Sequence, residues 1–396
     1  MLIHRGYRYR IYPNSQQAIL FAMFFGCCRF VYNYFLALRQ KVYASERRNM
    51  SQYECMRLVT ELKRDKDHLW LTGCDSMALQ EAIKDLNKAF VNFFEKRAGY
   101  PRFHKKHYAQ SYRTRNQGHS VRIEGNYVII PKVGAVKARI SRLPQGRILN
   151  ATITRTATGK YFVSLCVEEE LVPKPNNGGV VGIDLGISDF YADSNGHSVP
   201  NPRALRLHEK KLRREQRRLS RMIESNITGY CKGPKGGRVP VYKKPLSECQ
   251  NIQKQRLKVA LVHEKVVNIR TDMQHKISTR LVSENQVIAV ESLNVRGMVR
   301  NHKLAKAISD VSWGRFLSTL EYKAFEHGSD VLKVDTFFPS SQLCSECGYQ
   351  NAKVKNLGVR KWVCPKCGAV HDRDVNAAKN ILSKALGTVG HTGTGH

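Results

Sequence analysis

Four cysteines near the C-terminus constrain the fold of this chain more than any other feature of its sequence. Cys344 and Cys347 form one Cys-x-x-Cys pair, and Cys364 and Cys367 form a second pair after the sixteen residues 348 to 363. A glycine follows each pair and permits the tight turn that places two thiolates on one side. This spacing is typical of zinc ribbons, in which four sulfurs hold a structural zinc ion tetrahedrally. The sequence therefore predicts a structural Zn²⁺ site at these four cysteines.

The other cysteines and the N-terminal region indicate a reducing compartment. The apolar stretch over residues 21–38 is interrupted by Arg29 and Asn33, and the first residues of the chain lack the apolar core of a secretory signal. We therefore expect a buried helix and no membrane span. The remaining seven cysteines show no metal-ligand spacing, so we interpret them as reduced and mostly packed residues of a cytoplasmic, nucleoid-associated protein; they are Cys27, Cys28, Cys55, Cys74, Cys166, Cys231 and Cys249.

The charge of the chain indicates a polyanionic partner. There are 66 Lys and Arg residues against 32 Asp and Glu residues, which gives a formal net charge of +34. Nucleic acid is the default partner of such an excess. A heteroduplex of about 20 base pairs carries about 40 phosphates, which is comparable with this charge. A ribosome-binding or nucleoid protein is the alternative, but those proteins rarely need a chain of 396 residues.

The apolar pattern predicts an α/β chain with two or three domains. An aromatic and basic strand at residues 7–13 is followed by helical patterns and then, over 121–168, by short strands that suggest a small barrel or sheet. The run 173–179 reads as a linker. After it we expect a second unit, in which strands alternate with long basic helices over 203–222 and 246–282 and with a mobile loop over 229–244.

Three carboxylates in this basic chain are candidate ligands of a catalytic metal. Asp184 lies within an apolar strand, Glu291 ends a second apolar strand, and Asp374 opens a helix. Each has an ordinary explanation when taken alone, such as a solvated strand end or a helix cap. Together they offer the oxygen ligands that Mg²⁺ prefers and that two-metal phosphodiester cleavage needs. Asp335 and Asp372 compete for the third position.

These residues lie within motifs that resemble the TnpB family of transposon-encoded, RNA-guided nucleases, which are related to type V CRISPR effectors. The resemblance covers nearly the whole chain and includes the two cysteine pairs. Its other motifs are Gly182-Ile183-Asp184-Leu185-Gly186, Val290-Glu291-Ser292-Leu293-Asn294 and Asp372-Arg373-Asp374-Val375-Asn376-Ala377-Ala378-Lys379-Asn380-Ile381. Upstream segments that also match are Arg29 to Asn33, Tyr100 to Phe103, Ser111 to Thr114 and Phe338 to Cys344.

The resemblance implies a metal-dependent DNA endonuclease with an RNase H-like RuvC unit. Asp184, Glu291 and Asp374 correspond to its three acidic motifs, which would hold two Mg²⁺ ions for phosphodiester hydrolysis. A guide RNA from the transposon end and a double-stranded DNA target are the implied partners, with a monomer favoured. The implied domains are a β-barrel wedge (1–13 and 112–176), a helical recognition domain (14–111), the RuvC-like nuclease (177–340 and 369–386), the zinc ribbon (341–368) and a disordered tail (387–396).

By the same resemblance, the N-terminal domains would read a short DNA motif beside the target. The matching positions are Gln80, Tyr112, Arg113, Asn116 and Gln117. Gln80, Asn116 and Gln117 could equally be ordinary surface amides. Three other functions stay open at this point. They are an RNA-guided repressor that binds without cutting, a transposase that joins DNA strands on the same fold, and a zinc-bearing structural RNA binder.

Overall fold

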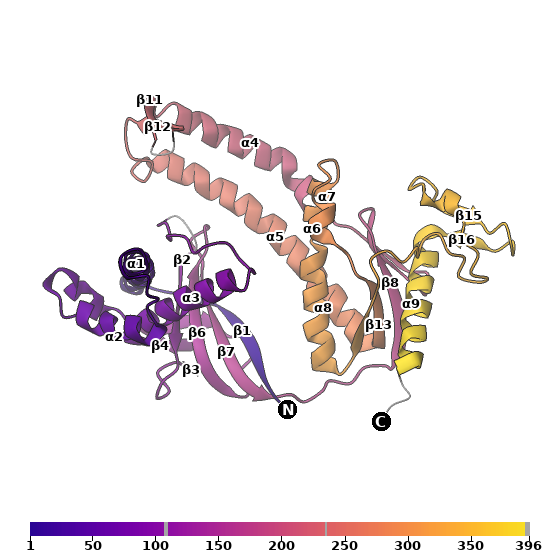
Figure 1. Ribbon diagram of the computed structural model, residues 1–396, viewed down its shortest axis with the longest axis horizontal. Coiled ribbons are helices and arrows are strands. Elements are labelled where there is room, and N and C mark those ends of the chain that lie inside the picture. The colour runs from indigo at the N-terminus through magenta and orange to yellow at the C-terminus, as the bar shows by residue number, and fades with distance from the viewer. Residues whose placement is uncertain (107–109, 234–235, 393–396) are drawn as a thin grey trace. The chain divides into compact units, whose positions relative to one another are not determined.

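The computed structural model describes residues 1–106, 110–233 and 236–392, with side chains described to residue 387 (Figure 1). Its contacts divide the chain into two units, Met1–Leu171 and Val172–His396. The boundary falls just before the Pro- and Gly-containing run that reads as a linker. Each unit has its own sheet and its own hydrophobic core.

A seven-stranded antiparallel sheet forms the base of the first unit. Its strands lie in the order β2-β6-β7-β1-β5-β4-β3, and no pairing joins β2 to β3 among the described residues. The sheet is therefore a half-barrel, open between these two edges. The strands are β1 (Leu2–Tyr12), β2 (Gln110–Arg115), β3 (Arg122–Glu124), β4 (Tyr127–Ile130), β5 (Gly134–Arg139), β6 (Arg147–Arg155) and β7 (Tyr161–Glu170).

Helices inserted between β1 and β2 cover one face of this sheet (Figure 1). They are α1 (Ser15–Glu46), α2 (Gln52–Leu62), the 3₁₀ helix η1 (Lys66–Gly73) and α3 (Ser76–Phe94). Helix α1 is long and apolar enough to cross a membrane by length and composition. Its phenylalanines Phe21, Phe24 and Phe35 are nevertheless fully buried in the core that the sheet and helices share. This packing explains the apolar composition of α1 as that of a core helix.

The second unit contains a mixed five-stranded sheet in the order β10-β9-β8-β13-β14. Strands β8 (Gly179–Leu185), β13 (Asn285–Glu291) and β14 (Asp330–Val334) are parallel, whereas β9 (Asp189–Asp193) and β10 (Ser198–Pro200) extend the sheet antiparallel. Ile288 and Val290 pack into a core with α5 (Gln250–Glu284) and α8 (Trp313–His327), and Ala289 packs into another with α9 (Arg373–Thr392). The unit is thus a three-layer α/β/α fold with an RNase H-like arrangement.

Two long helices extend from this core as an antiparallel pair (Figure 1). Helix α4 (Ala204–Glu224) packs along α5, and Leu212 and Ile252 are buried in the pair. Strands β11 (Ile227–Lys232) and β12 (Arg238–Tyr242) join the helices as a hairpin. The expectation of a loop over 229–244 is therefore wrong, because the alternating Val239-Pro240-Val241 segment pairs with β11. Residues 234–235 at the tip lie outside the described residues.

The remaining elements lead to the cysteines and to the C-terminal helix. Short helices α6 (Val295–Met298) and α7 (Ala305–Val311) follow β13, and η2 (Ala352–Lys355), β15 (Lys361–Val363) and β16 (Val370–Asp372) surround the cysteines. Helix α9 continues to Thr392. The tail expected to be disordered from residue 387 is thus helical over 387–392, since Gly387 weakens a helix by only about 1 kcal/mol and no proline follows. Residues 393–396 lie outside the described residues.

Candidate active site and metal centre

Asp184 and Glu291 lie on neighbouring parallel strands at the same edge of the second sheet. Ile183 of β8 is paired with Val290 of β13, so each acid is one residue further along its strand. Side chains at matching positions of parallel strands point to the same face. The apolar residues beside the two acids are buried, which leaves both carboxylates only partly accessible. The sheet register therefore brings together two acids that are 107 positions apart in the sequence.

Helix α9 brings Asp374 to the same edge because it lies unusually close to β8. A Cβ atom added at Gly182 would be 2.2 Å from the carbonyl oxygen of Ala378 and 2.8 Å from the Cβ of Leu382. Only glycine fits at this contact, and Ala378 is fully buried on the helix side of it. The first glycine of the Gly-Ile-Asp-Leu-Gly motif therefore lets the helix that carries Asp374 approach the strand that carries Asp184.

The two competing acids have other positions. Asp372 Oδ1 accepts hydrogen bonds from the backbone amides of Asp374 at 3.0 Å and Val375 at 3.2 Å. Asp372 is therefore the N-cap of α9, and Asp374 lies in the first turn with its carboxylate free of capping. Asp335 follows β14 and is exposed. These positions favour Asp374 as the third acid of the site.

The other two acids contribute to the electrostatic environment of Asp184. Burial raises the pKa of Asp184 to about 7, and the negative charges of Glu291 and Asp374 contribute to the same increase. The positive charges of the Arg373 and Arg360 guanidinium groups oppose this increase and lower the pKa of Asp184. Burial also raises the pKa of Glu291. Two carboxylates with raised pKa values, Asp184 and Glu291, form an electrostatic environment that a divalent cation relieves.

Arg360 belongs to this site although sequence reasoning did not single it out. Its Nη1 lies 3.2 Å from Asp374 Oδ2, and its Nη2 lies 3.5 Å from the hydroxyl of Ser188, just after β8. The carbonyl oxygen of Arg360 also accepts a hydrogen bond from the amide of Arg373 at 2.8 Å. The chain thus places one cation against the carboxylate group, from a segment between the two cysteine pairs.

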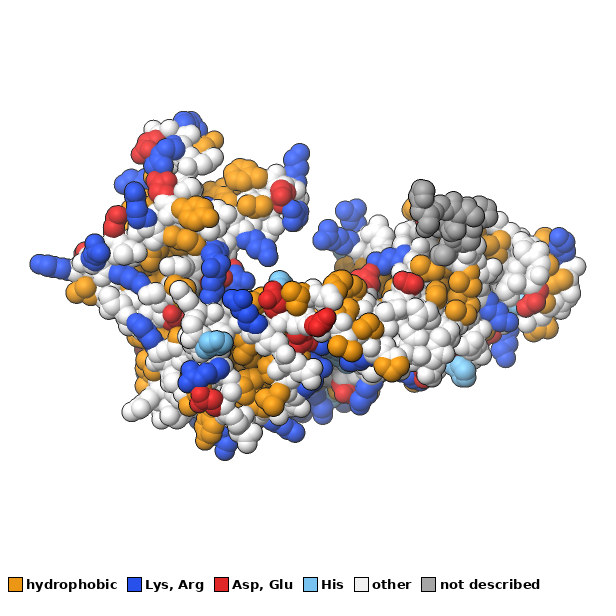
Figure 2. All heavy atoms as spheres, turned by 90° about the horizontal axis from the view of Figure 1, so that it is seen from below, with side chains coloured by type: hydrophobic (Ala, Val, Ile, Leu, Met, Phe, Trp, Pro, Cys, Tyr) orange, Lys and Arg blue, Asp and Glu red, His pale blue; other side chains and the backbone are white. Residues whose placement is uncertain are grey.

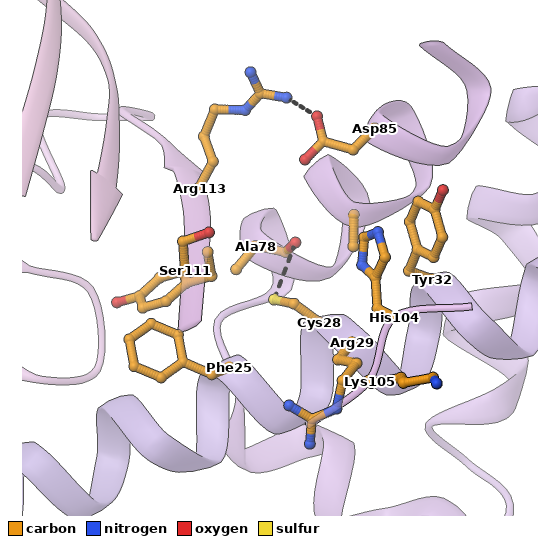
Figure 3. A pocket seen from close by; sticks show the side chains of 12 residues that line it. Phe25, Cys28, Arg29, Tyr32, Ala78, Asp85, His104, Lys105, Ser111 and Arg113 are labelled. Atoms are coloured by element: carbon orange, nitrogen blue, oxygen red, sulfur yellow. Dashed lines mark hydrogen bonds and ion pairs between the residues drawn. The ribbon is translucent and has the colours of Figure 1, made fainter. Parts of the chain in front are cut away.

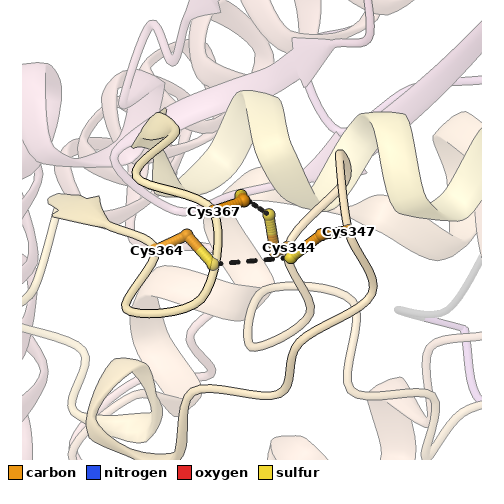
Figure 4. Close-up of side chains that lie close together, drawn as sticks. All are labelled: Cys344, Cys347, Cys364 and Cys367. Atoms are coloured by element: carbon orange, nitrogen blue, oxygen red, sulfur yellow. Dashed lines mark hydrogen bonds between the residues drawn. The ribbon is translucent and has the colours of Figure 1, made fainter.

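The four predicted zinc ligands converge (Figure 4). Their sulfurs all lie within 4.8 Å of one another, with Cys344 Sγ 3.6 Å from Cys367 Sγ and Cys347 Sγ 3.6 Å from Cys364 Sγ. A tetrahedral zinc with Zn–S bonds of about 2.3 Å separates its sulfurs by about 3.8 Å. The residues therefore fit a Zn²⁺ ion.

The two cysteine pairs have the same backbone geometry. The amide of Gly348 donates to the carbonyl of Cys344, and the amide of Gly368 donates to that of Cys364, both at 2.9 Å. The two glycines have φ values of +72° and +75°. A residue with a Cβ atom is strained in this conformation. The glycine after each pair is thus explained by the turn, as its position in the sequence predicts.

Two asparagines of α9 fix the first cysteine turn to the active-site helix. Asn376 donates to the carbonyl of Leu343 at 2.6 Å and accepts from the amide of Ser345 at 3.0 Å. Asn380, one helical turn further, donates to the carbonyls of Ser340 and Leu343. Both asparagines are buried. The Asn-x-x-x-Asn spacing therefore places two side-chain amides on one side of α9, where they form hydrogen bonds with the backbone of this loop.

The predicted DNA-contacting residues of the first unit have different accessibilities. Gln80 on α3 is partly exposed, and Gln117 after β2 is exposed. Asn116 donates to the carbonyl of Ile148 at 2.9 Å and accepts from the amide of Val121 at 2.8 Å, so it stabilises the turn. Tyr112 is buried among Phe21, Phe24 and Phe25. Its burial gives it a packing role and corrects the prediction of a nucleic-acid contact.

Arg113 lies at the rim of a cavity of about 240 Å³ between α1, α3 and β2 (Figure 3). It forms ion pairs with Asp85 and with Glu81, the latter at 2.9 Å. The ring of His104 stacks on Tyr32 inside the cavity, with 3.8 Å between ring centroids and 9° between ring planes. Arg29 and Lys105 also line the cavity and bring positive charge to it. Arg113 is thus held by carboxylates in this structure.

The basic excess is widely distributed over the surface. On the face shown in Figure 2, Lys and Arg side chains are spread over much of the surface and Asp and Glu side chains are fewer. Helix α4 carries the densest run. Exposed cations recur along one side of it at helical spacing, namely Arg206, Lys210, Arg213, Arg217 and Arg221. This row spans about 22 Å at 1.5 Å per residue.

Three family models match successive parts of the chain. Residues 1–48 match a model described as "Helix-turn-helix domain", residues 164–302 match "Probable transposase" of the OrfB_IS605 type, and residues 313–381 match "Cas12f1-like, TNB domain". In this structure residues 2–46 form strand β1 and the single helix α1, so the first description does not fit the geometry. The third match contains the four cysteines and Asp374.

Two curated relatives match almost the full length. A protein of Streptomyces pristinaespiralis named "Putative RNA-guided DNA endonuclease" is 36% identical over 97% of this chain and 90% of its own length. A protein of Escherichia coli strain K12 named "Putative RNA-guided DNA endonuclease InsQ" is 29% identical over 96% of this chain and 92% of its own length.

A solved structure is similar in fold. The structure entitled "Cryo-EM structure of the Cas12f1-sgRNA-target DNA complex" has a TM-score of 0.58 and covers 96% of this chain and 98% of its own. The sequence identity is 12%, so this likeness concerns the fold.

Proposed function

Because the chain belongs to the TnpB family of IS605-type transposon proteins, we propose that it is an RNA-guided DNA endonuclease that cleaves target DNA beside a short flanking motif. The observation that carries the proposal is the position of Asp184 and Glu291 at the same edge of neighbouring strands, with Asp374 on α9 near enough to raise the pKa of Asp184. All three acids are intact. A guide RNA from the transposon end and double-stranded DNA are the proposed partners of a cytoplasmic, nucleoid-associated monomer.

Asp184, Glu291 and Asp374 would hold two Mg²⁺ ions. Their donors are all carboxylate oxygens, which suit a hard cation. The burial of Asp184 and Glu291 and the repulsion of Asp184 by the other two acids make an added positive charge favourable. When bound, the two ions supply activation of the attacking water and stabilisation of the leaving 3′ oxygen. Arg360 would donate to the phosphate that is cleaved, after exchanging its partner Asp374 for the substrate.

Cys344, Cys347, Cys364 and Cys367 would hold a structural Zn²⁺ ion. The sulfur separations of 3.6 Å support this assignment, as do the two matched turns. A closed four-sulfur site leaves no open position for substrate. The proposed role of the zinc is therefore to stabilise the segment that carries Arg360.

Expression with the native flanking DNA tests the whole proposal. The copurified RNA is sequenced, and the complex is incubated with Mg²⁺ and a plasmid library that is randomised beside the target. We expect one bound RNA species and loss of plasmids with one flanking motif. Asp184→Ala should retain RNA and target binding and lose cleavage. Guided binding without cutting by the wild-type complex would favour a repressor, and RNA-independent joining of transposon ends would favour a transposase.

A further inference from the structure

A buried histidine lies against the cysteine cluster and is not one of the four predicted ligands. His371 is on β16, and its side chain is 6% exposed. Its Nε2 atom lies 3.1 Å from Cys344 Sγ. Its ring packs on Trp362 of β15, with 4.7 Å between ring centroids, and the two residues are paired across the strands. The indole thus fixes the ring plane in which Nε2 points at the sulfur.

The chemistry of the cluster determines the direction of this contact. A zinc-bound cysteine is a thiolate and can only accept a hydrogen bond. Nε2 of His371 must then carry the hydrogen and donate it to Cys344. Four thiolates around one Zn²⁺ ion leave two net negative charges, which are costly where water is excluded. Cys344 is 1% exposed, whereas Cys367 is exposed, so the Cys344 sulfur depends on donors of the protein, which include the backbone of Glu346 and Cys347 as well as His371.

The strand that carries His371 leads directly into the active site. Two residues after the histidine, the amide of Arg373 donates to the carbonyl of Arg360 at 2.8 Å. The guanidinium of Arg373 donates to the carbonyl of Asn356 at 3.0 Å. Asp374 follows, with its carboxylate against Arg360. His371, which contacts Cys344, is therefore separated from Asp374 by only two residues of the chain.

We propose that His371 is a positioning residue of the zinc cluster, which donates from Nε2 to the Cys344 thiolate and connects the cluster through β16 to Asp374 and Arg360. The inference rests on the zinc part of the proposed function. In this proposal His371 helps to keep the metal bound, in addition to the packing role that its burial alone would give it.

Zinc release from the purified, RNA-bound protein tests the proposal. Zinc content is measured first, and release to a chromogenic chelator is then followed for wild type, His371→Phe and His371→Gln. Phenylalanine keeps a ring against Trp362 but has no N–H group, and glutamine keeps an N–H group near the Nε2 position. We expect His371→Phe to weaken zinc retention by about 10- to 100-fold and His371→Gln to recover most of it. His4→Phe, at an exposed histidine of the first unit, is the control and should release zinc as wild type does.

A spectroscopic measurement separates the hydrogen bond from general destabilisation. In Co²⁺-substituted protein, loss of an N–H donor to a thiolate should move the sulfur-to-metal charge-transfer band to longer wavelength in His371→Phe and not in His371→Gln. Equal zinc release and equal spectra in all three proteins would overturn the role of His371 while leaving zinc binding intact. A wild-type protein that contains no zinc would overturn the zinc proposal as well. Release that is fast in both variants would assign His371 a packing role only.

Discussion

At the scale of single residues, the burial of the Asp184 carboxylate is unfavourable for folding. Its pKa is raised from 3.8 to about 7, mainly by burial. Folding therefore disfavours the ionised form. The unfavourable contribution is absent below pH 3.8, where the carboxyl is protonated in both states, and grows as the pH rises until it is complete above about pH 7. A bound divalent cation reverses this effect because it requires the carboxylate.

Asp184→Asn should therefore stabilise the protein in buffer without Mg²⁺, and more strongly at higher pH. We expect the difference in free energy of unfolding between the variant and wild type to increase by roughly 2 to 4 kcal/mol between pH 4 and pH 8, at about 1.4 kcal/mol per pKa unit. Urea unfolding at several pH values measures it. Added Mg²⁺ should stabilise wild type and not the variant. A difference that stays constant with pH would contradict the raised pKa.

Arg360→Gln should reduce cleavage by about 10²- to 10³-fold with little effect on binding of the guided target, because one preorganised cation beside the reacting phosphate is lost. The variant should also shift the pH profile of cleavage to higher pH, since Arg360 lowers the pKa of Asp184. Single-turnover cleavage across pH 6 to 9 measures both effects. Lys361→Gln, at the exposed neighbouring residue, should cleave as wild type does. Loss of target binding in Arg360→Gln would indicate a different role.

The sequence alone could predict the three acids but not Arg360. Each acid lies in an apolar strand or at a helix start, and these contexts are visible in sequence. Arg360 is one of 66 basic residues of the chain and one of four between the cysteine pairs, so no sequence pattern distinguishes it. Its place in the site depends on the ion pair with Asp374, which is a tertiary contact that no local sequence pattern shows.

At the scale of elements, the contact between α9 and β8 controls the position of Asp374. Gly182→Ala would place a methyl group 2.2 Å from the Ala378 carbonyl, so the helix must move away from the strand. We expect destabilisation by about 1 to 3 kcal/mol and a larger loss of cleavage than of target binding. Thermal unfolding and single-turnover cleavage measure the two effects.

Gly314→Ala is the matched control for this contact. Gly314 lies near the start of α8, where an added Cβ meets nothing within 4 Å. Alanine there should leave cleavage unchanged and raise stability by up to about 1 kcal/mol. If both glycine variants behaved alike, the close approach of α9 would not be what positions Asp374.

Elements were predictable where their pattern was local. The half-barrel strands within 121–168 and the long basic helices follow from alternation and helical periodicity, whereas β2 (Gln110–Arg115) lies in a polar run before the predicted range. The β11–β12 hairpin was missed because Gly- and Lys-rich sequence has little strand propensity, although cross-strand pairing stabilises it. The role of Tyr112 was also misjudged. Its burial depends on three phenylalanines of α1, which lie some 90 positions earlier in the sequence.

For the whole molecule, the net charge of +34 implies that binding to RNA depends strongly on salt. The exposed row on α4 is the surface where we expect successive phosphates to lie. Arg213 in this row already pairs with Glu209, whereas Arg217 and Arg221 are exposed on the same side. These two arginines are therefore the most informative positions at which to remove charge.

Arg217→Gln with Arg221→Gln should reduce the slope of log K against log salt concentration by about 1.4 to 1.8, because each lost phosphate contact contributes about 0.7 to 0.9. Lys353→Gln with Lys355→Gln on the ribbon is the charge-matched control, since both double variants lower the net charge by two. Filter binding of the guide RNA over a range of salt concentrations distinguishes them. Equal slopes for the two double variants would mean that total charge, and not the row on α4, determines RNA affinity. A smaller slope for the α4 variant alone would identify this helix as a place where the charge of the chain meets the RNA backbone.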